Sequence, residues 1–497
     1  MTDAEKPPSR KPALSRINLT KRGLLLAGGA LAAAAGLGAA AAHVWRTRTQ
    51  SADVLVIGAG NAGLAAAVSA AEAGCKVIVL EKNERLGLNT HSDRGLFGSS
   101  VSPDGHPIPG DSLERHFEDT MRGGGNAADP ELVHAFVAEA AKTLPWLKSL
   151  GMAFDAVPLL SASISPRCWQ PAWVGYTEIL YRRAKSLGVE IHYGEKLASL
   201  LQEGGRVSGA ATRDGAGNLH RYRATRGVIL ASGGFAANAR LVSQYAPELS
   251  GLPTDNQPGA QGEALEIAHA IGAAVTGMDA VQCIARPPGK LQNQGYLHLD
   301  ASRFIYIDAK GRRFVRETAP RDEVTREFLE RRDEPVYELA DNDTVLSYQI
   351  DIQKDLWKEL QSGAAVKADS ARALARKLGL DPRALEKTLR DYNRGVAAGE
   401  DALGKAPSAL KHRIETPPFW AVRVVMMVHE TLGGLRINRR AEVLSDSGAP
   451  IPGLFAAGSV TGGLHGRNRL GGNGIAAAIA FGRIAGRSAA RNPEAAA

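Results

Sequence analysis

A strand, a glycine-rich loop, a helix and a second strand follow one another without a break near the start of this 497-residue chain. The β-branched run 53–57 predicts a buried strand, and the loop 58–63 that follows it has the spacing G-x-G-x-x-G. A helical stretch, 64–73, and a second apolar run, 76–80, come next, and Glu81 ends that run. A lone glycine pattern is a weak signal, but this complete order is typical of a dinucleotide-binding βαβ unit.

The three glycines and the acid of this unit have distinct expected roles. Gly58 makes the tight turn, Gly60 lets the backbone approach a pyrophosphate, and Gly63 allows close packing of helix and strand. Glu81 is expected to accept hydrogen bonds from the hydroxyl groups of the adenosine ribose. These roles suit NAD and FAD equally, so the unit alone leaves the cofactor open.

Three further segments favour FAD. A polar loop ending in glycine, 89–95, follows soon after the unit, and a nicotinamide-binding half-domain has no standard use for it. Two more apolar runs, 227–235 and 452–459, end in small residues. Segments from both ends of the chain therefore converge on one long ligand, as a flavin dinucleotide requires.

The stretch HGRNRLGGNGIAAA, 465–478, lies just after the last of these runs. Its glycines let a ligand approach the backbone, and the helix that follows offers unpaired N–H groups with a partial positive charge. The stretch therefore predicts an anion-binding helix end, with Arg467 and Arg469 beside it.

The net charge of +8 is concentrated at the N-terminus, since residues 1–50 hold eight Lys or Arg against two acids. The remainder gives little support for a nucleic-acid partner.

Within 1–50, Lys21-Arg22 precedes the apolar run 23–42, which is rich in Ala and Gly. This order predicts an export signal of the twin-arginine type and a periplasmic protein. The alternative is a membrane anchor, because 20 residues can just span a bilayer.

Three widely spaced cysteines, Cys75, Cys168 and Cys283, form neither a disulfide framework nor a C-x-x-C motif. They are expected to be small buried residues. The missing C-x-x-C-H motif excludes a c-type haem attached to this chain, and no metal site is predicted.

Seven segments resemble the flavocytochrome c or soluble fumarate reductase family, which is related to the flavoprotein subunits of succinate dehydrogenase and fumarate reductase. The resemblance covers 53–488. The matching segments are VIGAGNAGLAAA (56–67), NT (89–90), LASGGF (230–235), NQPGAQGEAL (256–265), GRRFVRETAPRD (311–322), HETLGGLRIN (429–438) and PIPGLFAAGSVTGGLHGRNRLGGNGIAAAIAFGRIAG (450–486). The N-terminal half and the stretch 374–393 also resemble tricarballylate dehydrogenase-like and ketosteroid dehydrogenase-like relatives.

The resemblance implies an α/β fold with a Rossmann-like FAD-binding domain in two sequence pieces and an inserted α+β capping domain. The two pieces are expected at 51–279 and 431–497, and the cap at 280–430. Residues 1–50 are left as the export signal and a linker. The charged, helical middle of the chain suits a solvated cap.

The resemblance also implies the residues of the site. Arg321 corresponds to the family's proton donor, and Arg469 to the arginine that grips a substrate carboxylate, for which a guanidinium fork is well suited. The residues expected to face the substrate are Arg469, Glu430, His429, Gly472, Tyr296 and His298. The residues expected to bind FAD are Gly58, Gly60, Ala62, Gly63, Glu81, Lys82, Asn89, Thr90, Gly95, Leu197, Ser232, Gly233, Glu263, Gly458, Ser459, Gly471, Asn473 and Ile475.

Five positions in four motifs depart from the family pattern. Glu430 replaces the second His of His-His-Thr-Met-Gly-Gly, and 282–286 lacks the His of Gln-x-His-Pro-Thr. Leu297 and Asp300 stand where the proton relay has Glu-x-x-Arg, which leaves Asp300 and its neighbours Tyr296 and His298 as substitutes. Ser459 replaces a Glu that binds the flavin ribityl chain. An anion at 430 would repel a second carboxylate, or else accept a hydrogen bond from a neutral or cationic group. The alternative is that Glu430 turns away from the substrate and pairs with an arginine of the cap.

These features predict a periplasmic, FAD-dependent enzyme that reduces the C=C bond of an α,β-unsaturated carboxylic acid, with fumarate disfavoured. Urocanate, methacrylate, acrylate and cinnamate reductases are relatives of this kind. The alternatives are the reverse reaction on a saturated acid or ketosteroid-like substrate, a flavin electron-transfer protein without substrate chemistry, and an amine oxidoreductase. FAD is expected to bind non-covalently, because no histidine beside Asn89 and Thr90 can be equated with a flavin-linking one. His91 is the only candidate for a covalent link. A separate electron partner is expected, such as a c-type cytochrome.

Overall fold

The computed structural model describes residues 49–86, 95–159, 164–172, 174–289, 297, 300–348 and 350–493. Five residues singled out above, Asn89, Thr90, His91, Tyr296 and His298, lie outside the described residues, as does the expected export signal. Residues Ser51–Ala497 form one compact unit, so the division of the chain into two domains stays a prediction.

The larger of two main sheets is built on the predicted dinucleotide-binding unit. Its strand order is β16-β17-β8-β1-β2-β5, with β6 and β7 added beside β8. The pairs β1·β2, β2·β5 and β8·β17 are parallel, so their carboxyl ends share one edge. The strands are β1 (Thr49–Ile57), β2 (Val77–Leu80), β5 (Glu190–His192), β6 (Lys196–Glu203), β7 (Arg206–Arg213), β8 (Leu219–Leu230), β16 (Glu442–Leu444) and β17 (Pro450–Ala456).

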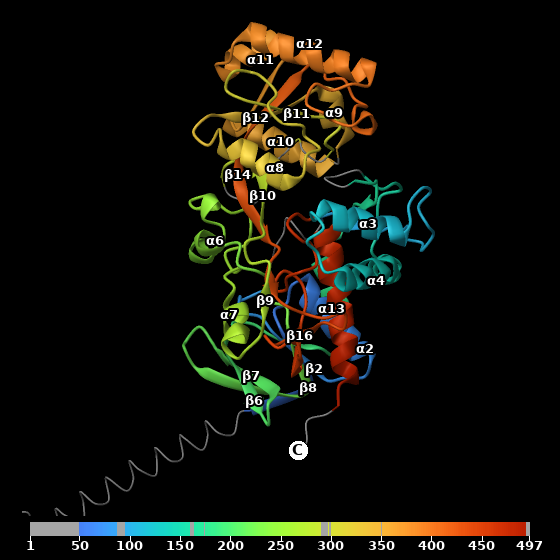
Figure 1. The fold of residues 1–497 in the computed structure, drawn as a ribbon, viewed down its shortest axis with the longest axis vertical. Coiled ribbons are helices and arrows are strands. Elements are labelled where there is room, and N and C mark those ends of the chain that lie inside the picture. The colour runs from blue at the N-terminus through green and yellow to red at the C-terminus, as the bar shows by residue number, and fades with distance from the viewer. Residues whose placement is uncertain are drawn as a thin grey trace, which may run out of the picture. The chain divides into compact units, whose positions relative to one another are not determined.

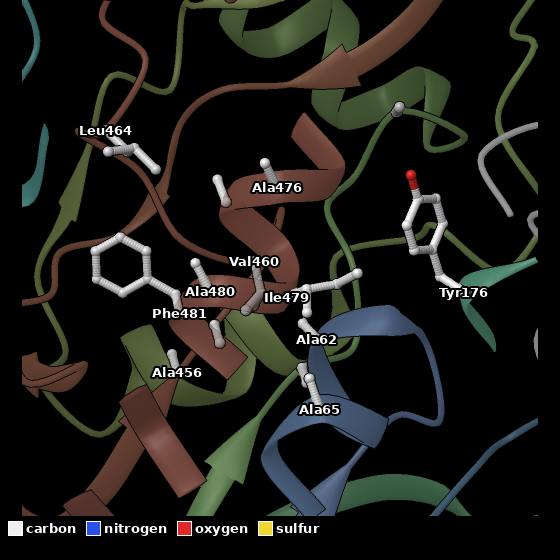
Figure 2. Close-up of a cluster of buried hydrophobic side chains, with 14 of the residues drawn as sticks. Ala62, Ala65, Tyr176, Ala456, Val460, Leu464, Ala476, Ile479, Ala480 and Phe481 are labelled. Carbon is white, nitrogen blue, oxygen red and sulfur yellow. The ribbon is translucent and has the colours of Figure 1, made fainter. Parts of the chain in front are cut away.

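Two helices from opposite ends of the sequence, α2 (Asn61–Glu72) and α13 (Asn473–Arg491), lie side by side (Figure 1). A Cβ added at Gly482 would lie 2.3 Å from the carbonyl oxygen of Ala62, so only glycine permits this approach. Small side chains complete the contact, and Figure 2 shows Ala62 and Ala65 near the side chains of α13. The start of α13 is thereby fixed relative to the glycine loop.

The second sheet has the order β10-β14-β12-β11, with β13 paired to β14. All of its strands come from 281–431, and β10 and β14 run antiparallel, side by side (Figure 1). Its strands are β10 (Val281–Arg286), β11 (Ile305–Ile307), β12 (Val336–Ala340), β13 (Ala365–Ala368) and β14 (Phe419–Thr431). Its helices are α8 (Arg321–Leu329), α9 (Asn342–Ser347), α10 (Ile350–Ser362), α11 (Ala371–Leu378) and α12 (Pro382–Ala398). A separate apolar cluster, including Leu374, Leu385 and Ile414, lies beneath α11 and α12.

The remaining elements connect these two sheets or cover the first. They are β3 (Phe97–Gly98), α3 (Leu113–Gly123), α4 (Pro130–Ser149), β4 (Cys168–Trp169), α5 (Tyr176–Ser186), α6 (Ala239–Tyr245), η1 (Pro247–Leu249), α7 (Glu263–Ala270), β9 (Val275–Thr276), η2 (Pro407–Ala409) and β15 (Gly434–Leu435). Among the described residues, we find no helix of the length and apolar character that crossing a membrane demands.

Two sequence expectations differ in detail from the structure. The strand expected over 227–235 ends at Leu230, because Gly233 adopts a φ of 80° and the chain turns away from the sheet. Cys75 is only half-buried, whereas Cys168 and Cys283 are buried as expected. The other predicted elements of the βαβ unit form as expected.

Candidate functional site

The glycine loop before α2 has the backbone geometry that a pyrophosphate site needs. Gly58 has a φ of 105°, and a Cβ on Gly63 would lie 1.9 Å from the carbonyl oxygen of Gly58. A Cβ on Gly60 would meet nothing within 4 Å, and Gly60 caps α2 without a side-chain hydrogen bond. The first N–H groups of α2 are therefore free to bind an anion at a positive helix end.

Glu81 is held beside this loop. Its Oε2 accepts a hydrogen bond from the backbone N–H of Ala59 at 2.9 Å, and its Oε1 accepts one from that of Asn83 at 3.0 Å. A carboxylate can accept further bonds, so ribose hydroxyls remain suitable donors. Lys82 and Glu263 bind each other, with Nζ 2.9 Å from Oε2. This ion pair joins the end of β2 to the start of α7.

The C-terminal glycines place a second helix start close to α2. Gly458 has a φ of 78°, and a Cβ there would lie 2.9 Å from the Cβ of Ala62. Gly472 caps α13, again without a side-chain hydrogen bond. A Cβ on Gly472 would lie 2.8 Å from the backbone nitrogen of Gly98, so the cap packs tightly against β3. The N–H of Asn473 donates to the carbonyl of Leu470 at 3.3 Å. The next N–H groups of α13, those of Gly474 and Ile475, are the ones that this helix end can offer to an anion.

The side chain of Asn473, the first residue of α13, is engaged within the protein. Its Oδ1 lies 3.1 Å from His116 Nε2, and its Nδ2 donates to Thr120 Oγ1 at 3.1 Å. Burial, together with the charge of Arg167, lowers the pKa of His116 to about 3, so this imidazole is neutral. Asn473 thus ties α3 to the start of α13, and any contribution to a cofactor would come from its backbone.

The other predicted cofactor residues are spread over several elements. Tyr176 donates a hydrogen bond to the carbonyl of Gly95 at 3.0 Å, and the thiol of Cys168 donates to that of Gly471 at 3.4 Å. Leu197 is buried in β6, and Ile475 is half-buried near the start of α13. Ser232 and Gly233 follow the end of β8. Their individual cofactor-binding roles stay predictions, but two uncapped helix ends and an anchored carboxylate fit a dinucleotide.

A second group of polar side chains links the second sheet to the segment before α13. Arg321, the first residue of α8, donates from Nη1 to Gln282 Oε1 at 2.7 Å. Gln282 in turn donates from Nε2 to the carbonyl of Arg469 at 3.0 Å and to Asn468 Oδ1 at 3.1 Å. One buried glutamine therefore holds the two predicted arginines in a single site.

Glu430 lies in this site and binds Arg469. Its Oε2 is 2.6 Å from Arg469 Nε, although the angle makes this an ion pair rather than an aligned hydrogen bond. Its Oε1 accepts a hydrogen bond from Ser459 Oγ at 3.0 Å. Burial opposes ionisation of Glu430, but Arg469 and nearby imidazoles outweigh it, so its pKa lies below the usual value. The alternative expectation was a pairing with a cap arginine, but the observed partner is Arg469, the arginine predicted to bind the substrate carboxylate.

A third charged group adjoins the first two. Asp255 accepts from Arg286 Nε at 3.1 Å and lies 2.9 Å from His429 Nδ1. Burial opposes ionisation of Asp255, but His429 and Arg286 outweigh it and hold its pKa well below the usual range. The side chain of His429 therefore faces Asp255, on the loop before α7.

The charges of this site do not balance. Arg469 is paired with Glu430 and Arg286 with Asp255, whereas no carboxylate of the described residues lies within ion-pair distance of Arg321. Burial, and next the charge of Arg469, lower the pKa of Arg321 to about 9, with Glu430 opposing. The three arginines and two carboxylates by themselves leave one net positive charge, to which any charge on His429 would add.

Several residues of this site were missed by the sequence reasoning. Gln282 and Arg286 appeared only as the ends of a segment that departs from the family pattern, and Asp255 directly precedes a matching segment. His465 is buried, and its Nδ1 has no hydrogen-bond partner among the described residues. Burial lowers the pKa of His465 to about 4, with Glu430 opposing. The sequence could have pointed to Gln282, Arg286 and Asp255 only through their positions at or beside segments compared with the family, and to His465 only as the first residue of the stretch 465–478.

The dinucleotide-binding helix ends, together with an adjoining cluster of buried arginines, define an FAD-dependent oxidoreductase. The FAD binding domain family matches residues 53–475, and the chain belongs to this family together with fumarate reductase flavoproteins. The expected α/β fold and family are thereby confirmed.

Three similar proteins support this assignment. A fumarate reductase (cytochrome) of Shewanella frigidimarina is 34% identical over 450 residues, covering 88% of this chain and 77% of that protein. The acrylate reductase flavoprotein subunit of Shewanella woodyi is 32% identical over 460 residues, covering 88% of this chain and 90% of that protein. The open conformation of a flavocytochrome c3 fumarate reductase has a TM-score of 0.71 at 29% identity, covering 90% of this chain and 79% of that one.

Proposed function

We propose that this protein reduces the C=C bond of an α,β-unsaturated monocarboxylic acid and that Arg321 supplies the proton. The observation that carries the proposal is the unpaired guanidinium of Arg321, held by Gln282 beside the paired Arg469. An arginine is ordinarily too weak an acid for this role. Partial burial and a neighbouring cation bring its pKa to about 9, which makes proton release feasible.

The chain's own residues account for binding and proton delivery. A bound flavin, once reduced by the electron partner, would supply a hydride to one carbon of the double bond and would be reoxidised in doing so. Arg321 delivers a proton to the other carbon, and Gln282 fixes the direction of its guanidinium by accepting from Nη1. The substrate carboxylate binds at the edge of Arg469 that Glu430 does not occupy. The products are the saturated acid and a neutral Arg321.

The charge of the site supports a substrate with one carboxylate. One net positive charge balances one carboxylate, and Glu430 already neutralises Arg469. A dicarboxylate would place a second anion near Glu430 in a partly desolvated site, which is unfavourable. The far end of the substrate is therefore neutral or cationic, and fumarate is a poor substrate.

Three further properties belong to this proposal. FAD binds non-covalently, the protein acts in the periplasm, and its electrons come from a separate partner such as a c-type cytochrome. The support is the Lys21-Arg22 pair before the apolar run 23–42 and the absence of C-x-x-C-H from the sequence. A folded, cofactor-loaded protein suits the twin-arginine route.

A panel of 2-enoic acids tests the function. The purified holoenzyme is reduced with dithionite under anaerobic conditions, and reoxidation of the flavin is followed after each acid is added. Rapid reoxidation by monocarboxylic enoates is expected, with loss of about 10²–10⁴-fold in Arg321→Ala. A wild-type protein that no enoate reoxidises, or an Arg321→Ala variant of near wild-type rate, would refute the proposal.

A further inference from the structure

The proposed reaction leaves Arg321 without a proton after every turnover, so the site needs a path that returns one. The sequence places Leu297 and Asp300 where the family relay has its two charged residues. Leu297 is apolar and fully buried. The Oδ1 of Asp300 accepts from the backbone and hydroxyl of Ser302, and its Oδ2 lies 3.7 Å from Arg303. Asp300 is therefore engaged within its own loop.

A different series of charged groups lies close enough to Arg321 for the charges of two of its members, Arg286 and Asp255, to act on it. His429, Asp255 and Arg286 are joined in that order by contacts of 2.9 and 3.1 Å. Their side chains are 26%, 3% and 12% exposed, so His429 is the member most open to solvent. The three residues thus run from a solvent-accessible imidazole into the buried site.

The pairing of β10 and β14 positions the series His429, Asp255 and Arg286 relative to Arg321. Gln282, which holds Arg321, and Arg286 lie on β10, and α8 packs against both β10 and β14. Gln282 pairs with Glu430 and Cys283 with Val428, so His429 is the extra residue of a β-bulge. A bulge re-aims side chains next to active sites, and here it lets His429 bind Asp255 while Glu430 binds Arg469.

The groups that face Arg321 come from four segments. They are Arg469 before α13, Glu430 on β14, Arg286 on β10 and Asp255 on the loop before α7, and the charge of each acts on Arg321. Arg321 in turn acts on the buried Tyr306 of β11. Arg286 and Asp255 are thus the two charged neighbours of Arg321 that also connect to His429.

We propose that His429, Asp255 and Arg286 return protons from solvent to Arg321, and this inference rests on the proposed reductase function. Neutral Arg321 takes a proton from Arg286, which regains one through Asp255 from the Nδ1–H of His429. His429 takes a proton from water at Nε2. Protonated Arg286 is the donor in the last step, and the deprotonated nitrogen of neutral Arg321 is the acceptor, directly or through a water molecule. The net transfer is one proton from solvent, and no electrons move.

The test exploits the fact that Arg321 starts each experiment protonated. In single-turnover reoxidation of the reduced holoenzyme, His429→Ala should lose far less of its rate than in steady-state turnover, because Arg321 is protonated at the start. In steady-state turnover with excess reduced methyl viologen, the same variant should be slower by about tenfold or more, as for loss of a proton-transfer group. Added imidazole should restore the steady-state rate. His429→Gln keeps a donor towards Asp255 but has no proton to pass on, so it should behave like His429→Ala.

His220→Ala is the matched control, because His220 forms a similar imidazole–carboxylate pair with Glu195 at 2.7 Å. FAD content and binding of a saturated monocarboxylate should be unchanged in all variants. Wild-type steady-state rates in both His429 variants, or an equal loss in the first turnover, would overturn the relay. If Tyr296→Phe or His298→Ala, and not the His429 variants, slowed steady-state turnover without slowing the first turnover, protons would return through 296–298 and the proposed relay would be wrong. If the wild type reduces no enoate, the proposed function fails and the relay with it.

Discussion

Replacing Glu430 by Gln should shift substrate preference towards dicarboxylates. Glu430 is paired with Arg469, with 2.6 Å between Oε2 and Nε. A dicarboxylate bound through Arg469 would add its far carboxylate to the site as a further anion, here taken at about 5.5 Å from Glu430. At an effective dielectric constant of about 20, two like charges at that separation repel by about 3 kcal/mol. Since about 1.4 kcal/mol corresponds to a factor of ten, the kcat/KM for fumarate should rise on the order of 10²-fold relative to that for acrylate.

Glutamine preserves the size of the side chain and can still accept the hydrogen bond from Ser459, so the site should keep its shape. Competition kinetics with fumarate and acrylate give the ratio of the two kcat/KM values directly. Glu178→Gln is the matched control, because it removes the same charge from an exposed helix pair with Arg182. A wild-type protein that prefers fumarate, or a Glu430→Gln variant with an unchanged ratio, would refute the reasoning.

Four further predictions follow from the site, the helix contact and the N-terminus. Because Arg321 must be protonated to act and its pKa is lowered to about 9, kcat/KM should hold at neutral pH and fall as the pH rises through about 9, in a pH-rate profile. Gly482→Ala should lower the free energy of unfolding by about 1–3 kcal/mol through the clash with Ala62, whereas Gly215→Ala, which faces open space, should not. This is measured by urea denaturation. Acid precipitation should release the flavin into the supernatant, and flavin retained on the protein would contradict non-covalent binding. Arg22→Ala should retain the protein in the cytoplasm, as fractionation and immunoblotting would detect.

The dinucleotide-binding unit could be predicted from the sequence because its geometry is local. Gly58 needs a positive φ, and Gly63 needs the absence of a side chain against the backbone of Gly58. Both requirements act within six residues and leave a readable spacing. The start of α13 could also be predicted, because the glycines before it and the Ala-rich run after it are adjacent in the chain.

The second sheet was less accessible to sequence reasoning. β10 and β14 are separated by more than a hundred residues, and their pairing and bulge depend on contacts that no local pattern records. The bulge decides that His429 turns to Asp255 while its neighbour Glu430 turns to Arg469. A shift of one residue in that register would exchange the two sides of the strand. Long-range register therefore determines the site, and spacing along the chain could not reveal it.

The effect of Glu430, which departs from the family pattern, depends on the residue that it binds. Read from the sequence, an anion at this position repels a second carboxylate or pairs with the cap. In the structure it binds Arg469, so it both removes one positive charge from the site and holds the arginine that is expected to grip the substrate. Arg321 is then the one arginine of the three without a carboxylate partner among the described residues. In the proposed function, this substitution would disfavour a dicarboxylate and leave the unbalanced charge at Arg321, where an anionic substrate would offset it and raise the pKa of Arg321 again. Substrate binding and proton delivery are consequently coupled through one ion pair.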